Sequence, residues 1–187
     1  MTNNPTNRLL YFAFGSNMLN ARLCRRCPGA RFRTIAAAHD HRVLFDKLSE
    51  DSSGKANLVP SRGGSRALGA IYDIPAAEVP ALDAFEGPGY ARRDDFRVSC
   101  LDTHGELETI TYVAHKSVGG LKPFDWYLAL VLAGMLERDV EPAYVQAIRA
   151  IEFDVDPEPA RISRLNAVRD LAEAGYHDYT ELLKRDA

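Results

Sequence analysis

The sequence predicts an α+β protein in which a mixed β-sheet, able to curl into a small barrel, is followed by a helical C-terminal third. Short runs rich in β-branched and aromatic residues fill the first two thirds of the chain, joined partly by glycine turns and partly by helical segments. From Pro123 onward the apolar residues follow a helical spacing instead. No linker divides the 187 residues, so we expect a single domain over 1–187.

The first half of the chain is expected to hold one short helix among strands. The helix is closed by Pro28-Gly29, and the arginines around it (Arg22, Arg25, Arg26, Arg31 and Arg33) are interpreted as a solvated helix face. The expected strands 56–60 and 66–74 flank the glycine turn 61–65 and are expected to pair as a hairpin. The expected strands are 8–14, 41–48, 56–60 and 66–74, and the helix is 20–26.

The second half changes from strands to helices. A helix opening at Pro75 is expected to bury a stripe formed by Ala76, Val79, Leu82 and Phe85. A second hairpin follows, and after it only helical segments, of which the extension 159–187 comes last. The hairpin strands are 92–101 and 106–115, and the helices are 123–136, 142–151, 159–174 and 178–185.

Composition and charge exclude several classes of partner. A net charge of −3 gives no electrostatic argument for binding nucleic acid. No apolar run approaches membrane-spanning length, so no membrane partner is expected. Residues 1–7 are polar and are interpreted as a flexible tail, and the three cysteines fit reduced thiols; we therefore expect a cytoplasmic protein.

The first candidate site is the stretch 11–18, Tyr-Phe-Ala-Phe-Gly-Ser-Asn-Met, where a strand stops before a helix. Gly15 tolerates positive φ and lets a ligand approach the backbone. Ser16 and Asn17 can bond to their own main chain or cap the next helix. Several backbone N–H groups would then point at one spot, which attracts a carboxylate or an oxyanion. The same connection is also common without any function, and this stretch alone does not decide.

The second candidate is Glu86, at the end of a helix beside Gly87 and Gly89 and after the apolar Phe85. A carboxylate held by glycines against an apolar wall can be desolvated and so adapted to proton transfer. A glutamate at a helix end is more often solvated and inert. The sequence around Glu86 alone leaves both interpretations open.

Taken together, the segments 11–18 and 82–90 resemble the signatures of the γ-glutamylcyclotransferase-like (AIG2-like) family. The resemblance implies a small closed β-barrel of about five to seven strands surrounded by helices. Weaker similarity extends to the family's central hairpin and its helical part, over 57–60, 68–72, 123–128, Gly134 and 142–145.

The resemblance also implies roles for single residues. The family's acid/base glutamate falls on Glu86, and a ligand-contacting tyrosine falls on Tyr127. Phe14 replaces a tyrosine that is usual in the loop, so any role of that hydroxyl is lost. Asn17 stands where glutathione-degrading relatives have leucine, which argues against glutathione as the substrate. The substrate-binding loop comprises Tyr11, Phe12, Ala13, Phe14, Gly15, Ser16 and Asn17.

The implied activity is an intramolecular acyl transfer that needs neither metal nor cofactor. A γ-glutamyl amino acid or amine would close to 5-oxoproline and release the amino acid or amine, with Glu86 as general acid/base. Whether the loop binds the oxyanion or the α-carboxylate stays open, as does a homodimer. Two alternatives keep the fold: a ligand-binding or regulatory module, and a tailoring lyase that removes a γ-glutamyl group from a biosynthetic intermediate. A serine hydrolase based on Ser16 is disfavoured, because the small residue two positions later is missing.

Overall fold

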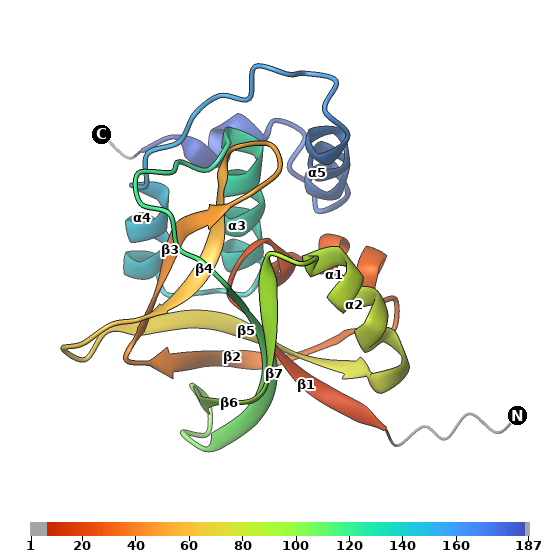
Figure 1. Ribbon diagram of the computed structural model, residues 1–187, viewed down its shortest axis with the longest axis vertical. Helices are drawn as coiled ribbons and strands as arrows, with labels where there is room; N and C mark the ends of the chain where they lie inside the picture. Colours follow the sequence, from red (N-terminus) through yellow and green to blue (C-terminus); the bar gives the residue numbers. More distant parts are fainter. Residues whose placement is uncertain (1–6, 186–187) are drawn as a thin grey trace, which may run out of the picture.

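The computed structural model describes residues 7–185, so the tail expected at 1–7 lies, apart from Asn7, outside the described residues. At the centre of the described part is a closed barrel with strand order β1-β5-β2-β6-β7 (Figure 1). Its neighbouring strands are antiparallel, except that β1 and β7 run parallel where the barrel closes. The expected α+β barrel is therefore confirmed. The strands are β1 (Arg8–Ala13), β2 (Arg31–His39), β5 (Arg66–Pro75), β6 (Tyr90–Cys100) and β7 (Glu106–Ala114).

The strand β2 was not expected, and Arg31 and Arg33 lie on it rather than on a helix face. Its inner half is Ala36, Ala37 and Ala38, all fully buried. Alanine is depleted in strands, so the local sequence pattern does not predict a strand here. The small side chains face a crowded interior, and tertiary packing overrides local preference.

A separate two-stranded sheet consists of β3 (His41–Leu48) and β4 (Gly54–Pro60), paired antiparallel. The expected hairpin between 56–60 and 66–74 is therefore wrong. β4 pairs with β3, whereas β5 pairs with β1 and β2. The chain leaves the barrel after β2 at Asp40, whose φ is 54°, and returns to it through 61–65. The expected second hairpin is confirmed, as β6 and β7 pair antiparallel.

Five α-helices, with three short 3₁₀ turns, accompany the strands in residues 7–185, and none of these helices has the length and apolar character to cross a membrane. Pro75 ends β5 instead of opening a helix, and Phe85 is 57% exposed, so it does not belong to the buried stripe. The helices are α1 (Asn20–Arg26), α2 (Val79–Glu86), α3 (Asp125–Glu137), α4 (Pro142–Arg149) and α5 (Ile162–Glu173), and the 3₁₀ turns are η1 (Ser16–Met18), η2 (Ala76–Glu78) and η3 (Tyr179–Leu183).

Helix α3 is the most buried helix of the described residues, with Asp125 to Met135 all buried, and α4 and α5 pack against it. It stands beside β3 and β4, and α5 and η3 also contact it (Figure 1). On its other side α3 contacts η1, the segment that follows β1. A Cβ atom at Gly134 would lie 2.6 Å from the backbone nitrogen of Leu19 and 2.7 Å from Cβ of Met18. Only glycine fits there.

A buried polar network fastens the segment after α4 to α3. Asp156 accepts hydrogen bonds from Trp126 Nε1 at 2.8 Å and from Arg161 Nε at 2.8 Å. Asp125 accepts one from the backbone N–H of Asp156 at 3.2 Å and one from the Tyr179 hydroxyl at 2.8 Å. Burial alone would raise the pKa of Asp156, but hydrogen bonds from Arg161, Glu158 N–H and Trp126 together lower it below the ordinary value.

The close approach at Gly134 predicts that Gly134→Ala destabilises the protein. The added methyl meets backbone atoms that cannot turn away, so we expect a loss of about 1–3 kcal/mol, the range for overpacking. Equilibrium unfolding in urea measures this change in the free energy of unfolding. Ala133→Gly on the same helix is the matched control, since it removes a methyl instead of adding one. An unchanged midpoint for Gly134→Ala would show that η1 can move aside.

The network predicts a pH-dependent contribution of Asp156 to stability. Because its folded pKa is depressed, the contribution is present above the unfolded value of about 3.9 and is lost as pH falls through the folded value. The difference in unfolding free energy between the wild type and Asp156→Asn should therefore shrink in acid. Urea unfolding at pH 7 and near pH 3 tests this. A difference that stays constant over that range would contradict it.

Candidate active site

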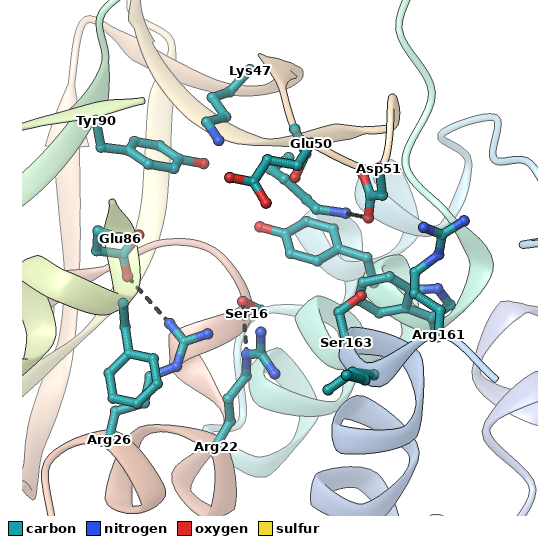
Figure 2. A pocket seen from close by; sticks show the side chains of 16 residues that line it. Ser16, Arg22, Arg26, Lys47, Glu50, Asp51, Glu86, Tyr90, Arg161 and Ser163 are labelled. Carbon is teal, nitrogen blue, oxygen red and sulfur yellow. Dashed lines mark hydrogen bonds and ion pairs between the residues drawn. The ribbon is translucent and has the colours of Figure 1, made fainter. Parts of the chain in front are cut away.

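Two adjoining cavities lie where the loop after β1, the end of α2, the tip of β3–β4 and the start of α5 meet. The outer one has a volume of about 580 Å³ and the inner one about 30 Å³. Four residues line both: Ser16, Glu86, Tyr90 and Tyr127. Figure 2 shows the outer cavity, with Glu86 and Tyr90 on one side and Arg161 and Ser163 on the other. The segment at the start of α5 thus forms part of its wall.

Glu86 is brought to the loop after β1, as the resemblance implies. Its side chain is 14% exposed. Its Oε1 atom accepts a hydrogen bond from Asn17 Nδ2 at 2.8 Å and lies 3.4 Å from Arg26 Nη1. Phe85 lines the outer cavity but is 57% exposed, and its ring lies against the Arg26 guanidinium, 5.2 Å away, so it does not enclose the carboxylate. Polar partners, not an apolar wall, hold this carboxylate.

The glycine in the loop has close neighbours and does not use the positive φ that glycine tolerates. The φ of Gly15 is −121°. A Cβ atom there would lie 3.0 Å from Cβ of Ala56 and 3.6 Å from the Tyr127 hydroxyl. The 3₁₀ turn η1 starts at the next residue. Its first hydrogen bond runs from Met18 N–H to Gly15 O, so the N–H groups of Ser16 and Asn17 come before this bond and receive no partner from the turn itself.

The side chain of Asn17 does not cap a helix, which corrects one of the expected uses of Ser16 and Asn17. Its Nδ2 donates to the Tyr11 hydroxyl at 3.0 Å as well as to Glu86, and its Oδ1 accepts from Arg26 Nη1 at 3.0 Å. Asn17 is 4% exposed. This amide therefore orients the carboxylate from inside the protein.

The other loop residues divide between cavity and core. Tyr11 and Phe14 line the inner cavity together with Gly15, Ser16 and Asn17. Phe12 and Ala13 do not line either cavity; both are buried, and the Phe12 ring stacks on Phe96 at 6.0 Å. Alternation along β1 explains the difference between Tyr11 and Phe12, because neighbouring side chains point to opposite faces.

Two tyrosine hydroxyls are fixed on the peptide of Ala56 in β4. Its N–H donates to the Tyr127 hydroxyl at 3.1 Å, and its carbonyl accepts from the Tyr90 hydroxyl at 2.7 Å. Burial raises the pKa of Tyr127 and raises that of Tyr90 well above its ordinary value. Both hydroxyls therefore keep their protons at neutral pH. Tyr127 was a predicted site residue, whereas Tyr90 was part of the quoted motif without a role.

The sequence interpretation missed the arginines of the site. Arg22 and Arg26 line the outer cavity instead of forming a solvated helix face. Arg22 Nε donates to Ser16 Oγ at 3.1 Å, and its Nη1 donates to Asp170 of α5 at 3.1 Å. The available signal was their spacing of four residues, which places both on one face of a helix that starts directly after the loop.

Comparison with known proteins finds similarity in sequence and in fold. Residues 66–148 match the AIG2-like family. The γ-glutamylcyclotransferases of Bos taurus and Homo sapiens are each 24% identical over 147 residues, which covers 76% of this chain and 78% of the relative. A solved γ-glutamyl cyclotransferase has a TM-score of 0.78 at 22% identity and covers 87% of this chain and 99% of its own.

A second solved structure, of an uncharacterized protein from Homo sapiens, has a TM-score of 0.77 at 23% identity with the same coverage. At these identities the solved structures show a shared fold. The family match and the curated relatives show, in addition to the shared fold, a similarity in sequence. The resemblance of this chain to the γ-glutamylcyclotransferase-like family is therefore confirmed, in sequence and in fold.

Proposed function

We propose that this protein is a γ-glutamylcyclotransferase that converts a γ-glutamyl amino acid or amine into 5-oxoproline and the free amino acid or amine. One observation carries the proposal. The carboxylate of Glu86, the loop after β1, Tyr90 and Tyr127 converge on one cavity, from four separate parts of the chain. The distant relatives that carry this name support the same activity.

The chemistry requires one bond to form and one to break. The α-amino nitrogen of the glutamyl group attacks its own γ-carbonyl carbon and closes a five-membered lactam. The bond between that carbon and the leaving nitrogen then breaks. The attacking ammonium loses a proton and the leaving amine gains one, so a single carboxyl group can carry the proton between them. Holding the glutamyl chain of the substrate in a conformation that brings its amino group to the γ-carbonyl carbon lowers the activation barrier by several kcal/mol.

Glu86 is oriented for the proton transfer. The contacts of Asn17 and Arg26 are both made to Oε1. Within residues 7–185, Oε2 has no hydrogen-bond partner, and Glu86 lines both cavities. In the proposed mechanism Oε2 takes the ammonium proton, while Asn17 and Arg26 stabilise the carboxylate before the transfer.

Negative charge that develops on the γ-carbonyl oxygen needs preorganised donors. In the proposed mechanism the Tyr127 hydroxyl and the N–H groups at the start of η1 supply them, since Tyr127, Gly15, Ser16 and Asn17 line the inner cavity. Tyr127 accepts from Ala56 N–H and so keeps its own proton for the substrate oxygen, whereas Tyr90 already donates its proton to the Ala56 carbonyl and shapes the cavity instead.

Replacing Glu86 by glutamine tests its role. The glutamine side chain keeps the size of glutamate and can still accept from Asn17 and Arg26, so we expect the fold to be intact. Turnover should fall by at least about 10²-fold, the scale for a lost general acid/base. Steady-state kinetics with circular dichroism as the folding control measures this. Near-normal turnover in the folded variant would contradict the assignment.

The proposed reaction is tested by incubating the purified protein with γ-glutamyl amino acids, γ-glutamyl amines and glutathione. We expect 5-oxoproline from at least one of the first two classes and none from glutathione. Chromatography with mass detection identifies both products. Release of free glutamate would mean hydrolysis and would contradict cyclisation. No product from any member would instead favour the binding module or a tailoring lyase with a dedicated substrate.

A further inference from the structure

Arg22 is an unusual arginine because it is buried and yet lines the outer cavity. Its side chain is only 13% exposed. It rises from α1 beside Arg26 and points toward Ser16 and the open cavity (Figure 2). Burial, and next the neighbouring Arg26, lower the pKa of Arg22 to about 10, which still leaves it protonated at neutral pH.

Arg22 shares its ionic partner with a second arginine. Asp170 also accepts from Arg25 Nε at 2.7 Å, and Arg25 bonds in addition to Glu173 at 2.7 Å. The hydrogen bonds of Arg22 within residues 7–185 use Nε and Nη1, and its Nη2 has no partner there. Ser16 Oγ accepts from Arg22 Nε, and the Ser16 hydroxyl also interacts with the hydroxyl of Tyr127.

Three of the other cations that line the cavity have hydrogen-bonded partners. Arg26 is bonded to Asn17 and Glu86. Lys55 donates to Asp51 at 2.8 Å, and Arg161 bonds to Asp156. The ammonium of Lys47 lies over the Tyr90 ring, 5.0 Å from its centre. Arg22 differs from these cations in combining burial, a hydrogen bond to the loop at Ser16 and, among residues 7–185, an Nη2 without a hydrogen-bond partner.

We propose that Arg22 and Ser16 bind the α-carboxylate of the γ-glutamyl group; this inference rests on the proposed function and assigns the site that anchors its substrate. A carboxylate is planar and accepts two hydrogen bonds side by side, which a guanidinium and a neighbouring hydroxyl can supply. Ser16 and Glu86 both line the two cavities. An α-carboxylate at Ser16 leaves the adjacent α-ammonium within the cavity that Glu86 faces.

Asp170 is then a positioning residue that acts through Arg22. It lies on α5, is 2% exposed, and orients the guanidinium from the side opposite to Ser16. Both Arg22 and Asp170 lie outside the segment 66–148 that matches the family. The C-terminal extension thus contributes to substrate binding through one ion pair and not by covering the cavity alone.

The inference is tested by binding, without turnover. The probes are 5-oxoproline and 2-pyrrolidinone, which share the lactam ring and differ in the carboxylate. We expect isothermal titration calorimetry to show wild-type protein preferring 5-oxoproline by at least about 30-fold, the scale for a buried charge-assisted contact. Arg22→Gln should reduce that preference to below about threefold. The fold should survive, because Asp170 keeps Arg25 as a partner.

The matched control is Arg169→Gln, an exposed arginine next to Asp170 that bonds only to Asn166 among the described residues. This variant should keep the full preference. In kinetics, Arg22→Gln should raise KM for the γ-glutamyl substrate by at least about 30-fold with a smaller effect on kcat. Asp170→Asn should raise KM less, and it should add little in the Arg22→Gln background because the two residues act as one unit.

The outcomes separate this inference from the proposed function. Wild-type protein that binds neither probe and makes no 5-oxoproline would overturn both. Wild-type protein that is active, with a preference unchanged in folded Arg22→Gln, would overturn only the role of Arg22. Additive effects of Asp170→Asn and Arg22→Gln on KM would overturn the role of Asp170.

Discussion

The site depends on one buried amide. Asn17 bonds to the hydroxyl of Tyr11 in β1, to Glu86 at the end of α2 and to Arg26 at the end of α1. Leaving a buried amide unsatisfied costs about 1–3 kcal/mol, so the three bonds favour one arrangement of the three elements. Asn17 thus ties the carboxylate to the barrel, and Asp83 of α2, which accepts from Tyr112 of β7 at 2.7 Å, adds a second tie.

The parts of the site that lie in one continuous stretch could be predicted from the sequence. The loop 11–18 and Glu86 each sit in a short motif, so their meeting followed from the resemblance and is seen in the bond between Asn17 and Glu86. The inner residues of that loop could not be sorted in advance. Whether Phe12 or Phe14 faces the cavity is decided by where β1 ends, a boundary that a pattern locates only within a few residues.

What the sequence could not provide is tertiary in origin. The alanines of β2 are fully buried between β5 and β6, pairings that the local pattern does not reveal, and without β2 the partner of β5 was assigned to β4. Arg22 looks like any surface arginine until α5, far along the chain, brings Asp170 to it. The close neighbour of Gly15 is Ala56 of another sheet, which the sequence around Gly15 does not reveal.

The peptide of Ala56 has a second consequence. β4 has a partner strand only on the side of β3, so its other edge would present unpaired N–H and C=O groups, the feature through which strands of separate molecules join. At Ala56 both groups are already taken, one by Tyr127 and the other by Tyr90. The hydroxyls that shape the cavity thereby also satisfy the backbone of β4 at Ala56, on a strand that, among the described residues, has a partner strand on one side only.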